Sequence, residues 1–90
     1  MKTQPFTKRE RAFYAAIGKR IVTQRHAKHW TQSKLAKRAK CTRVYLAQTE
    51  YGMYRASLTT LTALAESLGV HPAWLVFGVF SRRSRPTETP

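Results

Sequence analysis

Capping residues and glycines divide this chain into five short segments, and that division constrains the fold more than any other feature. The residues placed to begin a helix are Thr7, Thr31, Thr42, Ser57 and the pair His71-Pro72. Thr7 and Glu10 also make the S/T-x-x-E pattern of a capping box. Gly52, Gly69 and Gly78 stand where glycine commonly ends a helix. No β-alternation or hairpin signal interrupts the series, so the sequence predicts an all-α fold with five helices.

Apolar residues recur at helical spacing within each segment, which predicts the core. Those expected to face inward are Phe13, Ala16, Ile17, Ile21, Leu35, Ala36, Ala39, Tyr45, Leu46, Leu58, Leu61, Leu64, Ala65, Leu68, Trp74 and Leu75, with the first helix running to about Lys28. A length of 90 residues supports one domain. We expect that domain over residues 7–80, between a flexible basic arm (1–6) and a flexible basic tail (81–90) with nothing apolar to bury.

The charge balance points to a polyanionic partner, because 17 Lys and Arg against 4 Asp and Glu leave a net charge of +13. Other classes of protein are poorly supported. One cysteine, Cys41, allows no intramolecular disulfide and no cysteine zinc cage, which fits the cytoplasm. The four glutamates are scattered and Asp is absent, so we expect no enzyme and no cofactor. No apolar run approaches the roughly 20 residues of a membrane span, and no signal peptide is present.

The stretch from Trp30 to Gly52 reads as two short helices joined by a tight turn, and it resembles the helix-turn-helix of the phage repressor and Cro (XRE-type) family. The similarity extends from about Ile17 to Gly78. Its elements are Thr-Gln before Leu-Ala, a Glu two residues before Gly52, Ser-Leu-x-x-Leu-x-x-Leu-Ala, and Leu-Gly-Val-x-x-x-Trp-Leu. The resemblance implies a five-helix, lambda-repressor-like domain that binds double-stranded DNA.

Residues 42–50 would then form the recognition helix, and their chemistry suits base recognition. Arg43 can form a bidentate contact with guanine, Gln48 can pair with adenine, and Val44 offers a methyl surface to thymine. Ala47 lies on the same face and is small enough for close approach. In the resembling family, Arg43, Val44 and Gln48 occupy the usual base-contact positions; the alternative for each is a solvated surface side chain.

Contacts to DNA phosphates are expected around this helix, because such contacts position a protein without conveying sequence. The residues assigned to them are Gln32, Ser33, Lys34, Lys37, Arg38, Lys40, Thr42, Tyr54 and Arg55. Gln32 and Ser33 begin the second helix, whose free amides and dipole favour an anion.

Two further positions are informative through the resemblance. Glu50 lies near a helix C-terminus, where the helix dipole disfavours an anion, and a first-helix Arg pairs with this Glu in the family; we therefore predict an Arg25–Glu50 ion pair.

The sequence also departs from the family pattern. Lys40 stands at the turn position usually held by Gly, so either the turn avoids a positive φ or Lys40 carries about 1 kcal/mol of strain. Thr49 replaces the usual Ile or Leu before Glu50, which makes the core there slightly polar.

The last helix carries more large apolar residues than one short helix can bury, and surplus apolar surface usually marks an interface. The family binds DNA mostly as dimers through this helix, so we assign Trp74, Phe77, Val79 and Phe80 to a homodimer contact. The rival interpretation is a membrane-surface anchor completed by arginines of the tail. His26 and His29 lack a third ligand at suitable spacing, so no metal site is expected.

These expectations describe a sequence-specific regulator of transcription, most simply a repressor on a palindromic operator, with no small-molecule ligand and no membrane contact. An antitoxin that represses its own operon through the same fold is the first alternative. A basic RNA-binding protein is the second, although Tyr14, Tyr45, Tyr51 and Tyr54 do not gather on a strand surface as stacking platforms would.

Overall fold

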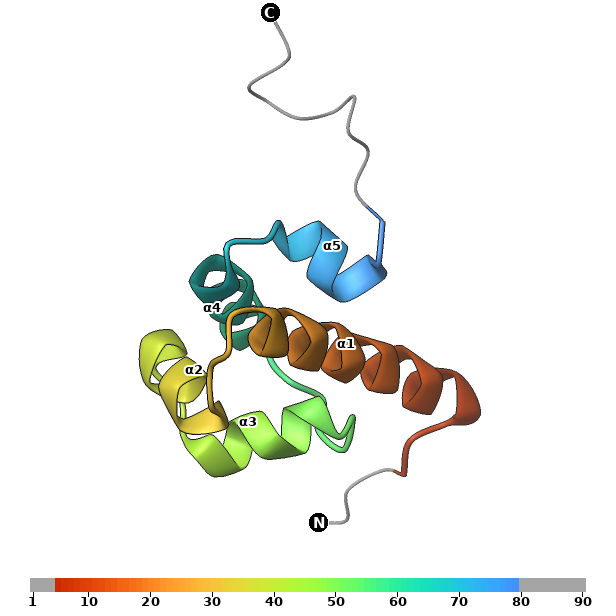
Figure 1. The fold of residues 1–90 in the computed structure, drawn as a ribbon. Coiled ribbons are helices and arrows are strands. Elements are labelled where there is room, and N and C mark those ends of the chain that lie inside the picture. Colours follow the sequence, from red (N-terminus) through yellow and green to blue (C-terminus); the bar gives the residue numbers. More distant parts are fainter. Residues whose placement is uncertain (1–4, 80–90) are drawn as a thin grey trace, which may run out of the picture.

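The computed structural model describes residues 5–79, which form five helices and, within that range, no strand (Figure 1). The helices are α1 (Lys8–Ala27), α2 (Gln32–Ala39), α3 (Arg43–Glu50), α4 (Leu58–Leu68) and α5 (Pro72–Phe77). The predicted all-α, five-helix fold is therefore confirmed. The expected arm and tail, and Phe80, lie in whole or in part outside the described residues.

The capping signals of the sequence begin all five helices. At α1 the capping box is complete: the Glu10 amide donates to Thr7 Oγ1, and the Thr7 amide donates to Glu10 Oε1, both at 3.0 Å. Thr31, Thr42 and Ser57 each accept a backbone amide of the first turn of their helix. His71 caps α5 through Nδ1, and Pro72 follows at its first position. Each cap satisfies an amide that the helix itself leaves without a partner.

One apolar core joins all five helices. Its fully buried large side chains are Ile17, Ile21, Leu35, Leu46, Leu64 and Leu75. Two of the expected core residues are corrected by the structure: Phe13 is 38% exposed and Leu58 is 70% exposed. Phe13 lies in the N-terminal half of α1, which extends past the other helices (Figure 1), and Leu58 is the first residue of α4. Phe13 meets only the last residue of α5, Phe77, with ring centroids 6.3 Å apart, and Leu58 lies on the open face of α4.

The long helix α1 holds α3 and α5 against the rest of the domain. Gly18 lets the backbone of α1 approach that of α3, because a Cβ at this position would lie 2.7 Å from the Thr49 carbonyl oxygen. Arg20 donates to the carbonyl oxygens of Leu75 and Val76 at 2.8 and 3.2 Å, and these contacts satisfy acceptors at the end of α5. Among residues 5–79 no helix has the length and apolar character needed to cross a bilayer.

Candidate nucleic-acid interface

The turn between α2 and α3 is tight, and it begins at Lys40, the C-cap residue of α2. Lys40 adopts the left-handed conformation (φ 61°, ψ 43°), which resolves the two alternatives for this position in favour of a positive φ. Its amide donates to the Lys37 carbonyl at 3.2 Å, and the Cys41 amide donates to the Ala36 carbonyl at 2.9 Å. Thr42 then caps α3. The chain reverses within these few residues, which sets the angle between the two helices of the motif.

Helix α3 has one buried side and one open side. Leu46 (0% exposed) and Thr49 (3%) face the core, and the Thr49 hydroxyl donates to the Tyr45 carbonyl at 2.8 Å, so the polar atom is satisfied. On the open side, Arg43 is exposed and Val44 is 58% exposed. Ala47 and Gln48 are half-buried. The structure thus brings the four predicted base-contact residues together on α3.

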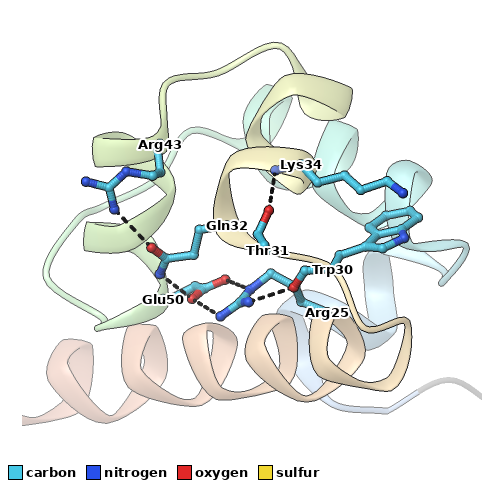
Figure 2. A network of polar contacts seen from close by, with 7 residues as sticks. All are labelled: Arg25, Trp30, Thr31, Gln32, Lys34, Arg43 and Glu50. Atoms are coloured by element: carbon cyan, nitrogen blue, oxygen red, sulfur yellow. Dashed lines mark hydrogen bonds and ion pairs between the residues drawn. The ribbon is translucent and has the colours of Figure 1, made fainter.

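An ion pair fixes the C-terminal end of α3 to α1. Arg25 Nε donates to Glu50 Oε2 at 2.8 Å and Arg25 Nη2 donates to Glu50 Oε1 at 3.0 Å, a bidentate contact (Figure 2). The side chains are only 11% and 4% exposed. Arg25 Nη1 also donates to the Trp30 carbonyl at 2.9 Å. The pair expected from the family resemblance is present, and it compensates the anion at the helix C-terminus.

Gln32 extends this ion pair into a network that reaches the open side of α3. Gln32 Nε2 donates to Glu50 Oε1 at 2.8 Å, and Arg43 Nη1 donates to Gln32 Oε1 at 3.2 Å (Figure 2). The amide is oriented by these partners, with its nitrogen toward the carboxylate and its oxygen toward the guanidinium. The sequence assigned Gln32 to a phosphate and missed this link. Its partners lie 11 and 18 residues away, so no local pattern signals it.

Lys40 and Thr42 lie in the turn described above, and the other six predicted phosphate contacts fall into two groups. Ser33, Lys34, Lys37 and Arg38 line an open hollow of about 640 Å³ on α2. Tyr54 and Arg55 lie in the loop after α3, where Tyr54 packs edge-on against Tyr45 (centroids 4.8 Å apart). Arg55 donates to Glu10 Oε1 at 3.1 Å and lies over the Phe6 ring at 4.3 Å. The structure adds an intramolecular role for Arg55 that its sequence position did not indicate.

Of the four residues expected at a dimer contact, two are exposed in the structure. Phe77 (65% exposed) and Val79 (70%) lie open, and the Phe77 ring is 6.3 Å from that of Phe13. Trp74 is half-buried and packs on the core. Phe80 is outside the described residues. The exposed apolar surface therefore includes Phe13 from α1, which the sequence had placed in the core.

Within residues 5–79, no three His, Cys, Asp or Glu side chains gather closely enough to hold a metal ion. Cys41 is half-buried, and burial raises the pKa of its thiol, which lowers its reactivity at neutral pH.

Comparison with known proteins places this architecture in a family. The sequence model of the helix-turn-helix family matches residues 21–75. An immunity repressor protein of Bacillus phage phi105 is 40% identical over 60 residues, which make up 67% of this chain and 42% of that protein. The chain thus spans about two fifths of the length of that relative.

Two solved structures share the fold. The restriction-modification controller protein C.AhdI from Aeromonas hydrophila superposes with a TM-score of 0.69 at 31% identity, covering 71% of this chain and 97% of that one. A hypothetical transcription factor, NHTF, from Neisseria superposes with a TM-score of 0.71 at 25% identity, covering 83% and 87%. The chain belongs to the helix-turn-helix family, in its phage repressor (XRE) branch. This family consists of DNA-binding transcription regulators, which are typically not enzymes.

Proposed function

We propose that this chain is a sequence-specific regulator of transcription, a repressor that occupies a palindromic DNA operator as a homodimer. The observation that carries the proposal is the division of α3 into an open face with Arg43 and Val44 and a closed face fixed by Glu50. A helix that reads bases must be exposed on one side and held rigidly on the other. The immunity repressor and the controller protein among its relatives support a role in transcription control.

Base recognition is assigned to the open face of α3. Arg43 would contact guanine O6 and N7, Gln48 would contact adenine, and Val44 would pack on a thymine methyl, with Ala47 allowing close approach. Arg43 is exposed and held by Gln32 Oε1 at 3.2 Å, which limits the conformations it must give up on binding.

Phosphate contacts would surround this face and supply most of the affinity. Ser33 and the α2 amides, Thr42 with the α3 amides, and Lys40 lie at the ends of the two motif helices. Gln32, Lys34, Lys37, Arg38, Tyr54 and Arg55 complete the set. If about six of these residues reach phosphates, affinity falls by about 10³ between 50 and 200 mM salt.

Dimerisation would use the exposed apolar end of the molecule, where Phe77 and Val79 lie open, together with Phe80 and the edge of Trp74. Residues 56–81 contain no Lys or Arg, so two copies of a +13 chain could meet there with the least repulsion. A dimer of this kind would place two recognition helices on half-sites about one helical turn apart.

Selection of bound duplexes from a random pool tests the proposal. We expect an enriched palindrome with half-sites about 10 base pairs apart. Arg43→Ala should lose about 1–3 kcal/mol of discrimination at one base position, whereas Lys8→Ala, an exposed change at the start of α1, should leave selectivity unchanged. No enriched sequence would refute specific binding, and a monomer by sedimentation at micromolar concentration would refute the dimer.

A further inference from the structure

One arginine of α1 holds the C-terminal end of α5, which lies beside α1 (Figure 1). The half-buried Arg20 donates through Nη1 to the carbonyl oxygens of Leu75 and Val76, at 2.8 and 3.2 Å. A helix leaves its last four carbonyls without an amide partner of its own, and its C-terminus attracts a cation. Within the part of the chain that the structure describes, neither ion pair uses Arg20. We call Arg20 with these two carbonyl groups the Arg20 clamp.

Apolar packing alone does not fix this end of α5. The helix has six residues, too few to be stable by itself, and only Leu75 and Val76 are buried. The next large side chains, Phe77 and Val79, are exposed. An open hollow of about 300 Å³ is lined by Trp74 and by four residues of α1, so the two helices are not closely packed there. We attribute the position of the last turn of α5 to the two hydrogen bonds from α1.

The chain that follows α5 lies against the same guanidinium. Gly78 ends the helix with φ 78°, and its amide donates to the Trp74 carbonyl at 2.8 Å. A Cβ added at Gly78 would lie 2.9 Å from Arg20 Cζ, closer than side chains normally pack. Glycine at this position therefore leaves room for the Arg20 clamp.

The clamp lies next to the residues that the proposed function assigns to the homodimer. Phe77 and Val79 directly follow its two carbonyl groups, and the Phe77 ring lies 6.3 Å from the Phe13 ring of α1. An apolar face binds a second copy more tightly when its side chains are already in place, because ordering them on binding costs free energy. The position of the last turn of α5 therefore affects the dimer as well as the fold.

We propose that Arg20 is a positioning residue for dimerisation, which holds the last turn of α5 so that Phe77 and Val79 form a preformed apolar face for a second copy of the chain. The inference rests on the dimer of the proposed function. Arg20 acts through the backbone of α5. In a dimer with two-fold symmetry both copies present the same face, so loss of the clamp weakens the contact twice.

Arg20→Met tests the clamp, because it keeps the apolar stem of the side chain and removes the donors. Sedimentation equilibrium, at a temperature at which parent and variant are both folded, should show the Kd of the dimer raised about tenfold. Arg20→Lys keeps a cationic donor and should recover part of the lost affinity. Lys8→Met removes the same charge from an exposed position at the start of α1 and should leave the Kd of the dimer unchanged.

Gly78→Ala tests the clamp from the other side. Its added methyl group would displace the Arg20 guanidinium, so the Kd of the dimer should rise. Gly69→Ala is the matched control, because Gly69 ends α4 with φ 76° and a Cβ there would meet nothing within 4 Å. Both changes carry the steric cost of a positive φ, but only Gly78→Ala reaches Arg20. In an Arg20→Met chain Gly78→Ala should raise the Kd by less than in the parent, since changes that act through one contact are not additive.

The dimer and the role of Arg20 fail in different ways. A folded Arg20→Met chain with the Kd of the parent would overturn the role of Arg20 and leave the dimer intact, even if its free energy of unfolding fell. A parent chain that stays monomeric at micromolar concentration would overturn the dimer and this inference with it. If Arg20→Met does not fold, Gly78→Ala and Gly69→Ala decide, and equal Kd values for these two variants would overturn the inference.

Discussion

Helices α3 and α4 are held in the domain by different forces. In α4 four side chains, Leu61, Leu64, Ala65 and Leu68, are buried, and the helix packs by its apolar stripe. In α3 only Leu46 and Thr49 are buried. The remaining attachment of α3 is polar or backbone: Glu50 pairs with Arg25, and Gly18 lets the two backbones touch.

The difference follows from what each helix must leave uncovered. If α3 presents its N-terminal face to DNA, as we propose, it cannot bury an apolar stripe of normal width on that face. Directional polar contacts then take the place of buried apolar area in holding the helix, because a bidentate ion pair fixes orientation as well as distance. The structure thus separates stability, which α4 serves through burial, from orientation, which α3 gains from Arg25 and Gln32.

The close approach of α1 and α3 gives the largest expected effect. Gly18→Ala would place a methyl group against the carbonyl oxygens of Glu50 and Thr49, two backbone atoms that cannot move aside. We expect a loss of about 4 kcal/mol in the free energy of unfolding, beyond the usual cost of overpacking. Helix propensity alone would predict a gain of about 1 kcal/mol. Urea denaturation will show whether the free energy of unfolding falls or rises.

Gly69→Ala is the control, because its added Cβ would meet nothing within 4 Å. It should cost only about 1 kcal/mol for its positive φ. A Gly18→Ala protein as stable as the parent would contradict the backbone contact.

Burial under α4 is tested by Leu64→Ala. Leu64 is 0% exposed, so its truncation should leave a cavity and lower the free energy of unfolding by about 3 kcal/mol. Leu58→Ala, on the same helix but at a residue 70% exposed, should change it by less than about 0.5 kcal/mol. Similar losses at the two positions would mean that α4 is not held by its apolar stripe.

The polar attachment of α3 is tested by Glu50→Ala. This change leaves Arg25 and Gln32 without their shared partner, and we expect a loss of about 2 kcal/mol, or roughly 8–16 °C in Tm for a chain of this size. Amide exchange should rise more in α3 than in α4. Glu66→Ala, at an exposed acid of α4, provides the charge-matched control. An unchanged Tm would refute the stabilising role of the pair.

The sequence predicted those parts of the molecule that depend on neighbours within a few residues. Thr7 and Glu10 signalled their capping box because both partners lie in one turn. Leu35, Ala36 and Ala39 were placed on the buried face of α2 by spacing alone.

What the sequence missed depends on distant neighbours. Phe13 has helical spacing but is covered only in part, by Phe77 at the end of α5. Gln32 reaches Glu50 only after α2 and α3 have packed. No local sequence pattern joins residues 25 apart, so the Arg25–Glu50 pair could be anticipated only through the family resemblance.

The turn between the motif helices allows a stabilising change. Lys40 has φ 61°, a conformation that glycine adopts without steric cost. Lys40→Gly should therefore raise the free energy of unfolding by up to about 1 kcal/mol. Lys37→Gly, inside α2, should lower it by about 1 kcal/mol. Equal destabilisation by the two glycines, measured by urea denaturation, would show that the left-handed turn is not strained.

The smallest expected effect lies at the exposed start of α1, far from the buried attachments of α3 and α4. The Thr7 backbone amide, and after it the Arg55 guanidinium, lowers the pKa of Glu10. A carboxyl whose pKa is lower in the folded state stabilises that state while it is ionised. This stabilisation is present above the ordinary glutamate pKa of about 4.3 and is lost as the pH falls through the lower folded value. Urea titrations between pH 7 and 3 should therefore show a shallower acid loss for Glu10→Gln than for the parent, and identical pH profiles would contradict the assignment.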